Sequence, residues 1–189
     1  MKKIFLVSVL FVAVVSLVSF KKNVAQPNIS SSQNDSLLYE GEKHFANMQQ
    51  LTFGGDNAEA YFSFDGKYIV FQKTSVKDGV PCDQIFVGKV PAPGEKFEYK
   101  RVSNGKGRTT CGAFLKDGKH VVFASTHLDA DNCPPTPDRA KYGNKYIWPL
   151  YSSYDIFVAD LDGNIVKQLT NSKGYDAEAT ISPDGQQML

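Results

Sequence analysis

Two glutamates stand in nearly identical surroundings in distant parts of the sequence. Glu59 lies in the segment N-A-E-A and Glu178 in the segment D-A-E-A, with Asn57 and Asp176 two positions before them. A pair of carboxylates brought together could bind a cation or a basic ligand, or carry out acid–base catalysis. The other interpretation is structural, because residues repeated in a repeat fold usually cap loop amides and bond between repeats. The repetition favours the structural role, and the binding role stays open.

Both glutamates belong to a longer segment that occurs three times. The copies are residues 57–66 (N-A-E-A-Y-F-S-F-D-G), residues 109–118 (T-T-C-G-A-F-L-K-D-G) and residues 176–185 (D-A-E-A-T-I-S-P-D-G). Each copy ends in Asp-Gly, which Lys or Gln and an apolar run then follow. Asp-Gly between two apolar runs is a strong hairpin signal, because the tight turn needs positive φ values that Asp tolerates and Gly adopts without strain. Each copy therefore predicts a strand, a tight turn and a second strand.

Two further strand-like runs follow each of the first two hairpins. They are residues 84–90 and 97–102 in the first repeat, and residues 155–160 and 165–170 in the second. Four antiparallel strands in about 40 to 50 residues, rich in turns and aromatic residues, are typical of one blade of a β-propeller. We predict an all-β fold, an incomplete propeller with blade 1 at about residues 57–102, blade 2 at about 109–170 and the start of blade 3 at 177–189.

The repeat resembles a known family. Its pattern of Q-L-T, a short loop, A-E-A, S-P-D-G, an apolar strand and D-I-F-V-A-D is similar to the TolB-like, PD40-type (WD40-like) β-propeller repeat. The resemblance covers residues 49–189, and the first two copies depart from it at the proline, with S-F-D-G and L-K-D-G. It implies periplasmic or envelope-associated contacts with proteins. We expect an exported, non-catalytic module, periplasmic or secreted, that binds envelope or secreted proteins and peptides.

Two other functions stay open, because propellers host many unrelated functions. The chain could be the N-terminal propeller of a prolyl-oligopeptidase-like or other peptidase whose catalytic domain follows, or a glycan-binding propeller. A closed propeller takes about four to eight blades, and this sequence supplies about two and a half. We expect an N-terminal portion of a longer propeller, the alternative being a short protein that closes by oligomerising.

The N-terminal part predicts export. Residues 1–25 begin with two lysines and an apolar run, which indicates a signal peptide or an uncleaved membrane anchor. Residues 26–43 are polar and predict a linker before the propeller at 44–189. Residues 44–53 end in the same Q-L-T motif as residues 168–170, so we expect them to form an outermost strand.

The three cysteines fall at one end of the predicted sheets. Cys111 starts a first strand, whereas Cys82 and Cys133 lie in loops between second and third strands. In an exported chain this favours a disulfide. We predict Cys111 with Cys133, which would attach the long loop to its own blade, or else Cys82 with Cys111. A metal site that includes His127 is the rival interpretation, but no paired metal-ligand spacing supports it.

A long insertion separates the second and third strands of the second repeat. Trp148, Tyr146 and other tyrosines of the insertion could form a platform for a peptide or a glycan, or a small core of the loop itself. Asp129 and Asp131 resemble a fragment of a calcium loop, but its glycine and bidentate glutamate are absent, so we expect a solvated turn.

Several classes of function lack support. The net charge of +1 provides no basic face for nucleic acid. The sequence contains no G-x-S-x-G elbow, no H-E-x-x-H motif and no phosphate-binding glycine loop. We therefore predict no catalytic residue, no metal and no cofactor, with contact to a membrane only through the N-terminal segment if it is retained.

Overall fold

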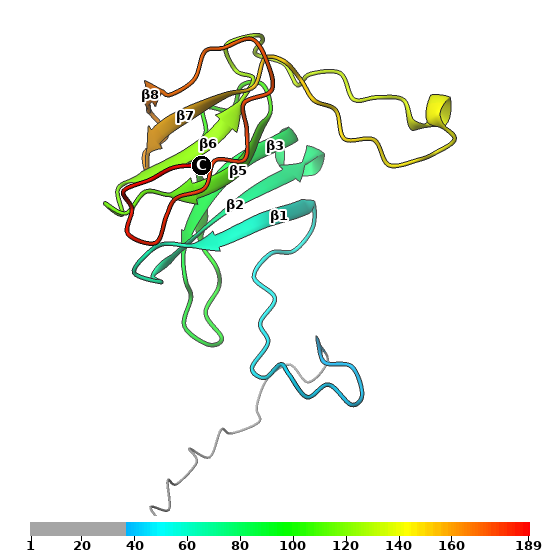
Figure 1. The fold of residues 1–189 in the computed structure, drawn as a ribbon. Helices are drawn as coiled ribbons and strands as arrows, with labels where there is room; N and C mark the ends of the chain where they lie inside the picture. The colour runs from blue at the N-terminus through cyan, green and yellow to red at the C-terminus, as the bar shows by residue number, and fades with distance from the viewer. Residues whose placement is uncertain (1–36) are drawn as a thin grey trace, which may run out of the picture. The chain divides into compact units, whose positions relative to one another are not determined.

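The computed structural model describes residues 37–189, whose regular elements are almost all β-strands (Figure 1). The signal peptide or anchor predicted at 1–25, and most of the linker predicted at 26–43, lie outside the described residues. Within the part that is described, no helix has the length and hydropathy needed to cross a bilayer.

The strands form two four-stranded antiparallel sheets, each ordered as the chain runs. The first sheet contains β1 (Asp56–Phe62), β2 (Tyr68–Ser75), β3 (Val80–Lys89) and β4 (Tyr99–Arg101). The second contains β5 (Thr109–Phe114), β6 (His120–Ser125), β7 (Asp155–Asp160) and β8 (Ile165–Gln168). Short 3-10 turns, η2 (Val76–Asp78) and η3 (Arg139–Tyr142), interrupt the connections. The four strands predicted for each of the first two repeats are thus confirmed, with small differences at their ends.

The Asp-Gly turns share one set of hydrogen bonds. In the first repeat, the amide of Gly66 donates to the carbonyl of Ser63 (2.8 Å), and the Asp65 carboxylate accepts from the amide of Lys67 (3.1 Å). Gly66 has a φ of 69°, which an L side chain rarely adopts. The same bonds recur at the two later copies, Asp117-Gly118 and Asp184-Gly185. The local sequence therefore fixes all three turns in the same way.

The two sheets pack face to face through the main apolar cluster. The first sheet and the segment after it contribute Val70, Ile85, Val87 and Val102 to this cluster. The second sheet contributes Phe114, Val121, Phe123, Phe157 and Ala159. Because side chains alternate along a strand, the neighbours of Val70 in β2, Ile69 and Phe71, point to the opposite face of the first sheet. There Phe97 and the partly buried Leu51 cover them.

The third copy of the repeat lies against the far face of the second sheet. Ala179 is buried with Val122 and Val158 of that sheet, and Ile181 packs beside them. Ile181 pairs with Met188 in an antiparallel bridge, and Thr180 exchanges backbone hydrogen bonds with Leu189 (2.9 and 3.0 Å). The repeats therefore stack as successive layers in chain order.

The prediction of a strand at residues 44–53 is wrong. The structure assigns no strand to these residues, and Phe45 and Phe53 are 63% and 78% exposed. A strand needs a neighbour to pair its backbone groups, and the described chain supplies none here. The segment is instead attached by side chains: Leu51 packs on the first sheet, and the Gln49 amide donates to the carbonyl of Glu95 (3.1 Å).

Candidate functional site

The same unusual backbone conformation recurs at one position of each repeat. Glu59, Cys111 and Glu178 have φ values of 51°, 54° and 63°, in the left-handed region. The pairing of β1 with β2 and of β5 with β6 shifts at this position, which identifies a β-bulge in each sheet. A left-handed conformation costs a non-glycine residue about 1–2 kcal/mol. Such strain persists only where the surroundings impose it, and it clusters at functional sites.

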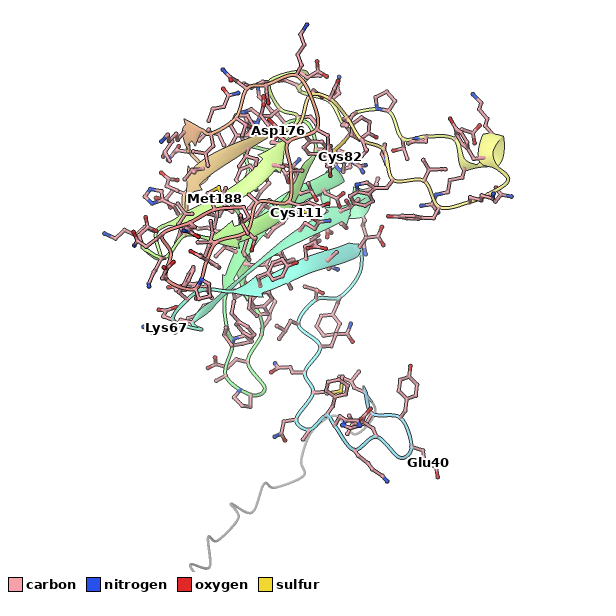
Figure 2. The ribbon with its side chains drawn as sticks, in the orientation of Figure 1. Glu40, Lys67, Cys82, Cys111, Asp176 and Met188 are labelled. Atoms are coloured by element: carbon pink, nitrogen blue, oxygen red, sulfur yellow. A yellow bond between two sulfur atoms is a disulfide. The ribbon has the colours of Figure 1, made fainter. Side chains whose placement is uncertain are left out.

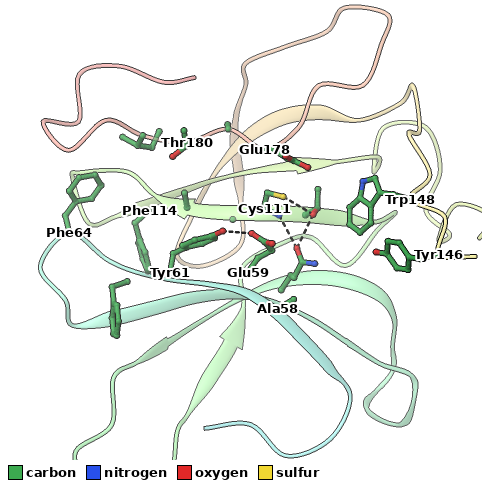
Figure 3. Close-up of a pocket in the computed structure, with 17 residues that line it drawn as sticks. Ala58, Glu59, Tyr61, Phe64, Cys111, Phe114, Tyr146, Trp148, Glu178 and Thr180 are labelled. Atoms are coloured by element: carbon green, nitrogen blue, oxygen red, sulfur yellow. Dashed lines mark hydrogen bonds between the residues drawn. The ribbon is translucent and has the colours of Figure 1, made fainter. Parts of the chain in front are cut away.

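The three left-handed residues line one cavity of about 840 Å³, which we call the main cavity (Figure 3). Residues of β1, of β5 and of the start of the third copy form its walls. Tyr146 and Trp148 from the long β6–β7 loop close one side. Side chains from all three repeats therefore meet at a single site, and Glu59 and Glu178 are both part of it.

A buried glutamine holds the bulge of the second sheet. Gln72, in β2, is only 7% exposed, and its side-chain oxygen accepts hydrogen bonds from the Cys111 amide and the Thr110 hydroxyl, both at 3.1 Å. The bond crosses from the first sheet to the second. Sequence reasoning missed Gln72, although a single amide directly after the apolar run Y-I-V-F was a usable signal.

The carboxylates give the main cavity a negative wall. The Tyr61 hydroxyl donates to Glu59 (2.5 Å), and this bond, together with burial, raises the pKa of Tyr61 to about 12. Burial raises the pKa of the Cys111 thiol, and the charges of Glu59 and Glu178 raise it further. Cys111 is therefore a neutral thiol at physiological pH and a poor nucleophile. Among residues 37–189, no three His, Cys, Asp or Glu side chains are grouped as a metal site.

The aromatic residues of the long loop have two different environments. Trp148 and Tyr146 are 49% and 68% exposed with ring centroids 6.4 Å apart, and the Arg139 guanidinium lies 5.2 Å from the Tyr146 ring centroid. Tyr154, at the base of the loop, is 3% exposed and packs edge-on against Tyr175. The outer part of the loop thus presents an aromatic surface to the main cavity, and only its base is core.

The predicted disulfides are wrong, because the structure pairs Cys82 with Cys133 and leaves Cys111 free. The bulge turns Cys111 toward the main cavity, where its sulfur lies 3.1 Å from the Thr110 hydroxyl. Cys82 lies in β3 beside the root of the long loop (Figure 2). A second contact to this loop is the hydrogen bond that the amide of Gly107 donates to the Asp131 carbonyl (2.9 Å). The disulfide therefore attaches the long loop to the first sheet, not to its own sheet.

The other candidate residues lie outside the main cavity. His127 bonds to the Ser125 hydroxyl (2.8 Å) and packs on the Phe157 ring; burial lowers the pKa of its imidazole. Asp176 accepts from the Ser172 hydroxyl (2.8 Å), and its amide donates to Tyr154.

The remaining polar candidates make local contacts. The Asn57 amide donates to the Gly54 carbonyl (3.2 Å). Asp131 pairs with Lys106 (2.9 Å), and the amide of Asp129 donates to the Thr126 carbonyl (3.0 Å). These contacts stabilise turns.

We expect the substitution Glu59→Gln to lower the pKa of Tyr61 from about 12 toward its ordinary value of about 10, because a neutral amide stabilises the phenol less than a carboxylate does. A pH titration of the ¹³Cζ resonance, assigned with Tyr61→Phe, measures this change. The more distant Glu178→Gln should shift the pKa less. Because folding raises this pKa, the stability contributed by Tyr61 is present below about pH 10 and is lost as the pH rises through 12. A pKa of Tyr61 unchanged by Glu59→Gln would show that the hydrogen bond is absent in solution.

Comparison with models of known protein families finds no match to this sequence, and comparison with curated proteins finds none either.

Proposed function

We propose that the chain is part of a TolB-like β-propeller that works as a protein-binding module in the cell envelope, with the main cavity as its binding site. One observation carries the proposal: equivalent left-handed residues of three successive repeats converge on one cavity and place two carboxylates in its wall. In a propeller the first strands of the blades surround the central channel, which agrees with this convergence.

Two further observations support the architecture and the location. Each repeat is a four-stranded antiparallel meander or the start of one, and the repeats stack in chain order. The disulfide between Cys82 and Cys133 fits an oxidising compartment, in agreement with the export that the sequence of residues 1–25 predicts.

The chemistry of the cavity favours a cationic group of the partner. Its described lining contains Glu59 and Glu178 but no Lys, Arg or His. The exposed ring of Trp148 can stabilise an ammonium or guanidinium group through its π face. A lysine or arginine side chain, or the amino terminus of a peptide, fits this combination best.

A titration of the full chain with a defined cationic probe tests the proposal. The probe is an acetylated, amidated pentapeptide with two lysines, and isothermal titration calorimetry measures its affinity. We expect Glu59→Gln with Glu178→Gln to weaken binding at least about tenfold, because hydrogen bonds to charged groups contribute about 1.5–3 kcal/mol each. The double variant Glu40→Gln with Glu98→Gln is the matched control, since it removes the same charge from exposed positions. Equal affinities of both double variants would overturn the cationic site.

A glycan is the second candidate, favoured by the exposed rings of Tyr146 and Trp148. A neutral oligosaccharide that binds the wild type, loses its affinity in Trp148→Ala and keeps it in the double glutamate variant would identify a glycan site instead. No observation in the described residues favours the peptidase alternative.

A further inference from the structure

A second, smaller cavity adjoins the main cavity. It encloses about 100 Å³ and shares Thr110, Tyr146 and Trp148 with the larger one. Its far side carries two arginines, Arg108 and Arg139, so we call it the arginine recess.

The guanidinium of Arg108 is incompletely paired. Its Nε atom is buried and has no hydrogen-bond partner, which is unusual for a charged donor in a folded protein. Its ion-pair partner is Asp83, with Nη1 and Oδ2 3.6 Å apart, and the other oxygen of Asp83 accepts from the Thr74 hydroxyl (2.6 Å). The Arg108 side chain lines the recess, is 22% exposed and makes only this one long ion pair among the described residues, so its terminal guanidinium nitrogens can donate to a further acceptor there.

The charge of the recess is opposite to that of the main cavity. Arg108 and Arg139 face a single carboxylate, Asp83, whereas the main cavity has Glu59 and Glu178 and no cation in its described lining. Tyrosines complete the recess: Tyr151, Tyr154 and Tyr175. Burial raises the pKa of Tyr154, which keeps its hydroxyl protonated and able to donate.

We propose that the arginine recess binds the carboxylate of a dipolar ligand whose cationic group occupies the main cavity. A volume of 100 Å³ corresponds to about three water molecules at about 30 Å³ each, which suits a carboxylate with its adjoining carbon. The planar guanidinium of arginine matches the two oxygens of a carboxylate. This inference rests on the proposed function and narrows its ligand class to molecules that carry both charges.

The single tryptophan of the sequence reports on both cavities, because Trp148 borders each of them. The probes are the dipeptide glycyl-lysine with a free carboxylate and the same dipeptide as its amide, which differ only in the anionic group. Acetate and inorganic phosphate are titrated separately. Changes in Trp148 fluorescence yield the affinities for the 189-residue chain.

We expect the free acid to bind at least tenfold more tightly than the amide. The substitutions Arg108→Gln and Arg139→Gln should each reduce this preference severalfold while the amide still binds. Arg139 lies in the exposed η3 turn, so its substitution leaves the core intact even if Arg108→Gln unfolds the chain. Lys167→Gln, an equal change of charge at an exposed position of β8, should keep the full preference.

Four results would overturn the inference. If the acid and the amide bind the wild type equally, the recess holds no part of the ligand, while the proposed cationic site stands. If the preference survives in Arg108→Gln and Arg139→Gln alike, the carboxylate lies elsewhere. If phosphate or acetate binds in an Arg108-dependent manner while acid and amide bind equally, the recess is a site for free anions. If neither dipeptide binds, the proposed function fails together with the inference.

Discussion

Replacing Cys82 and Cys133 by serine is expected to lower the free energy of unfolding by about 4 kcal/mol. The disulfide joins residues separated by 51 positions, and closing a loop of that length restricts the unfolded chain by about this amount in the chain-entropy treatment. Denaturant unfolding of the oxidised wild type and of the double variant, followed by circular dichroism, measures the difference.

The free cysteine supplies the control for this experiment. Cys111→Ser removes a thiol but no crosslink, so its effect should be well under half that of the double variant. A reductant should destabilise the wild type and Cys111→Ser alike and leave the double variant unchanged. If Cys111→Ser instead abolished the response to reductant, Cys111 would be part of the disulfide and the observed pairing would be wrong.

The second large effect is expected at the interface between the sheets. Phe114 is 3% exposed and belongs to the main apolar cluster, so Phe114→Ala should cost about 3–5 kcal/mol. Phe62 occupies the equivalent position of the first repeat but is 67% exposed. Phe62→Ala should therefore change the free energy of unfolding by only about 0.5 kcal/mol.

The comparison of these two variants measures the effect of burial alone, because both replace a phenylalanine at the same place in the repeat by alanine. Chemical denaturation of both proteins gives the two values. A cost for Phe62→Ala as large as that for Phe114→Ala would mean that another layer covers Phe62 in solution. Small costs for both would contradict the face-to-face packing of the two sheets.

Much of the fold could be predicted because its signals are local. The Asp-Gly pairs fix their turns through bonds between neighbouring residues, and the predicted strand at residues 155–160 coincides with β7. The continuous apolar runs that follow the first two Asp-Gly turns define β2 and β6 in the same way. The predicted strand at residues 44–53 failed because strand formation there requires a neighbour, and a local pattern does not reveal whether one is present.

The candidate site was predicted only in part. The register of the repeats places Glu59 and Glu178 together, and both line the main cavity. Neither glutamate nor cysteine favours a left-handed backbone, so the residue types at positions 59, 111 and 178 did not predict the bulges. Gln72 and Arg108 reach the two cavities through packing between sheets. The disulfide depends on the path of the loop at residues 126–154, which spacing alone does not determine.

The pKa of the Cys111 thiol tests the convergence of the repeats most directly, because Cys111 is the only free cysteine among the described residues and, in addition to its burial, the glutamates of the other two repeats raise its pKa. The rate of alkylation by iodoacetamide as a function of pH, followed by mass spectrometry on the oxidised 189-residue chain, provides this value. We expect a pKa above the ordinary range for cysteine in the wild type and a lower pKa in the variant with Glu59→Gln and Glu178→Gln. Identical pKa values in the two proteins would show that the three positions do not meet at one cavity.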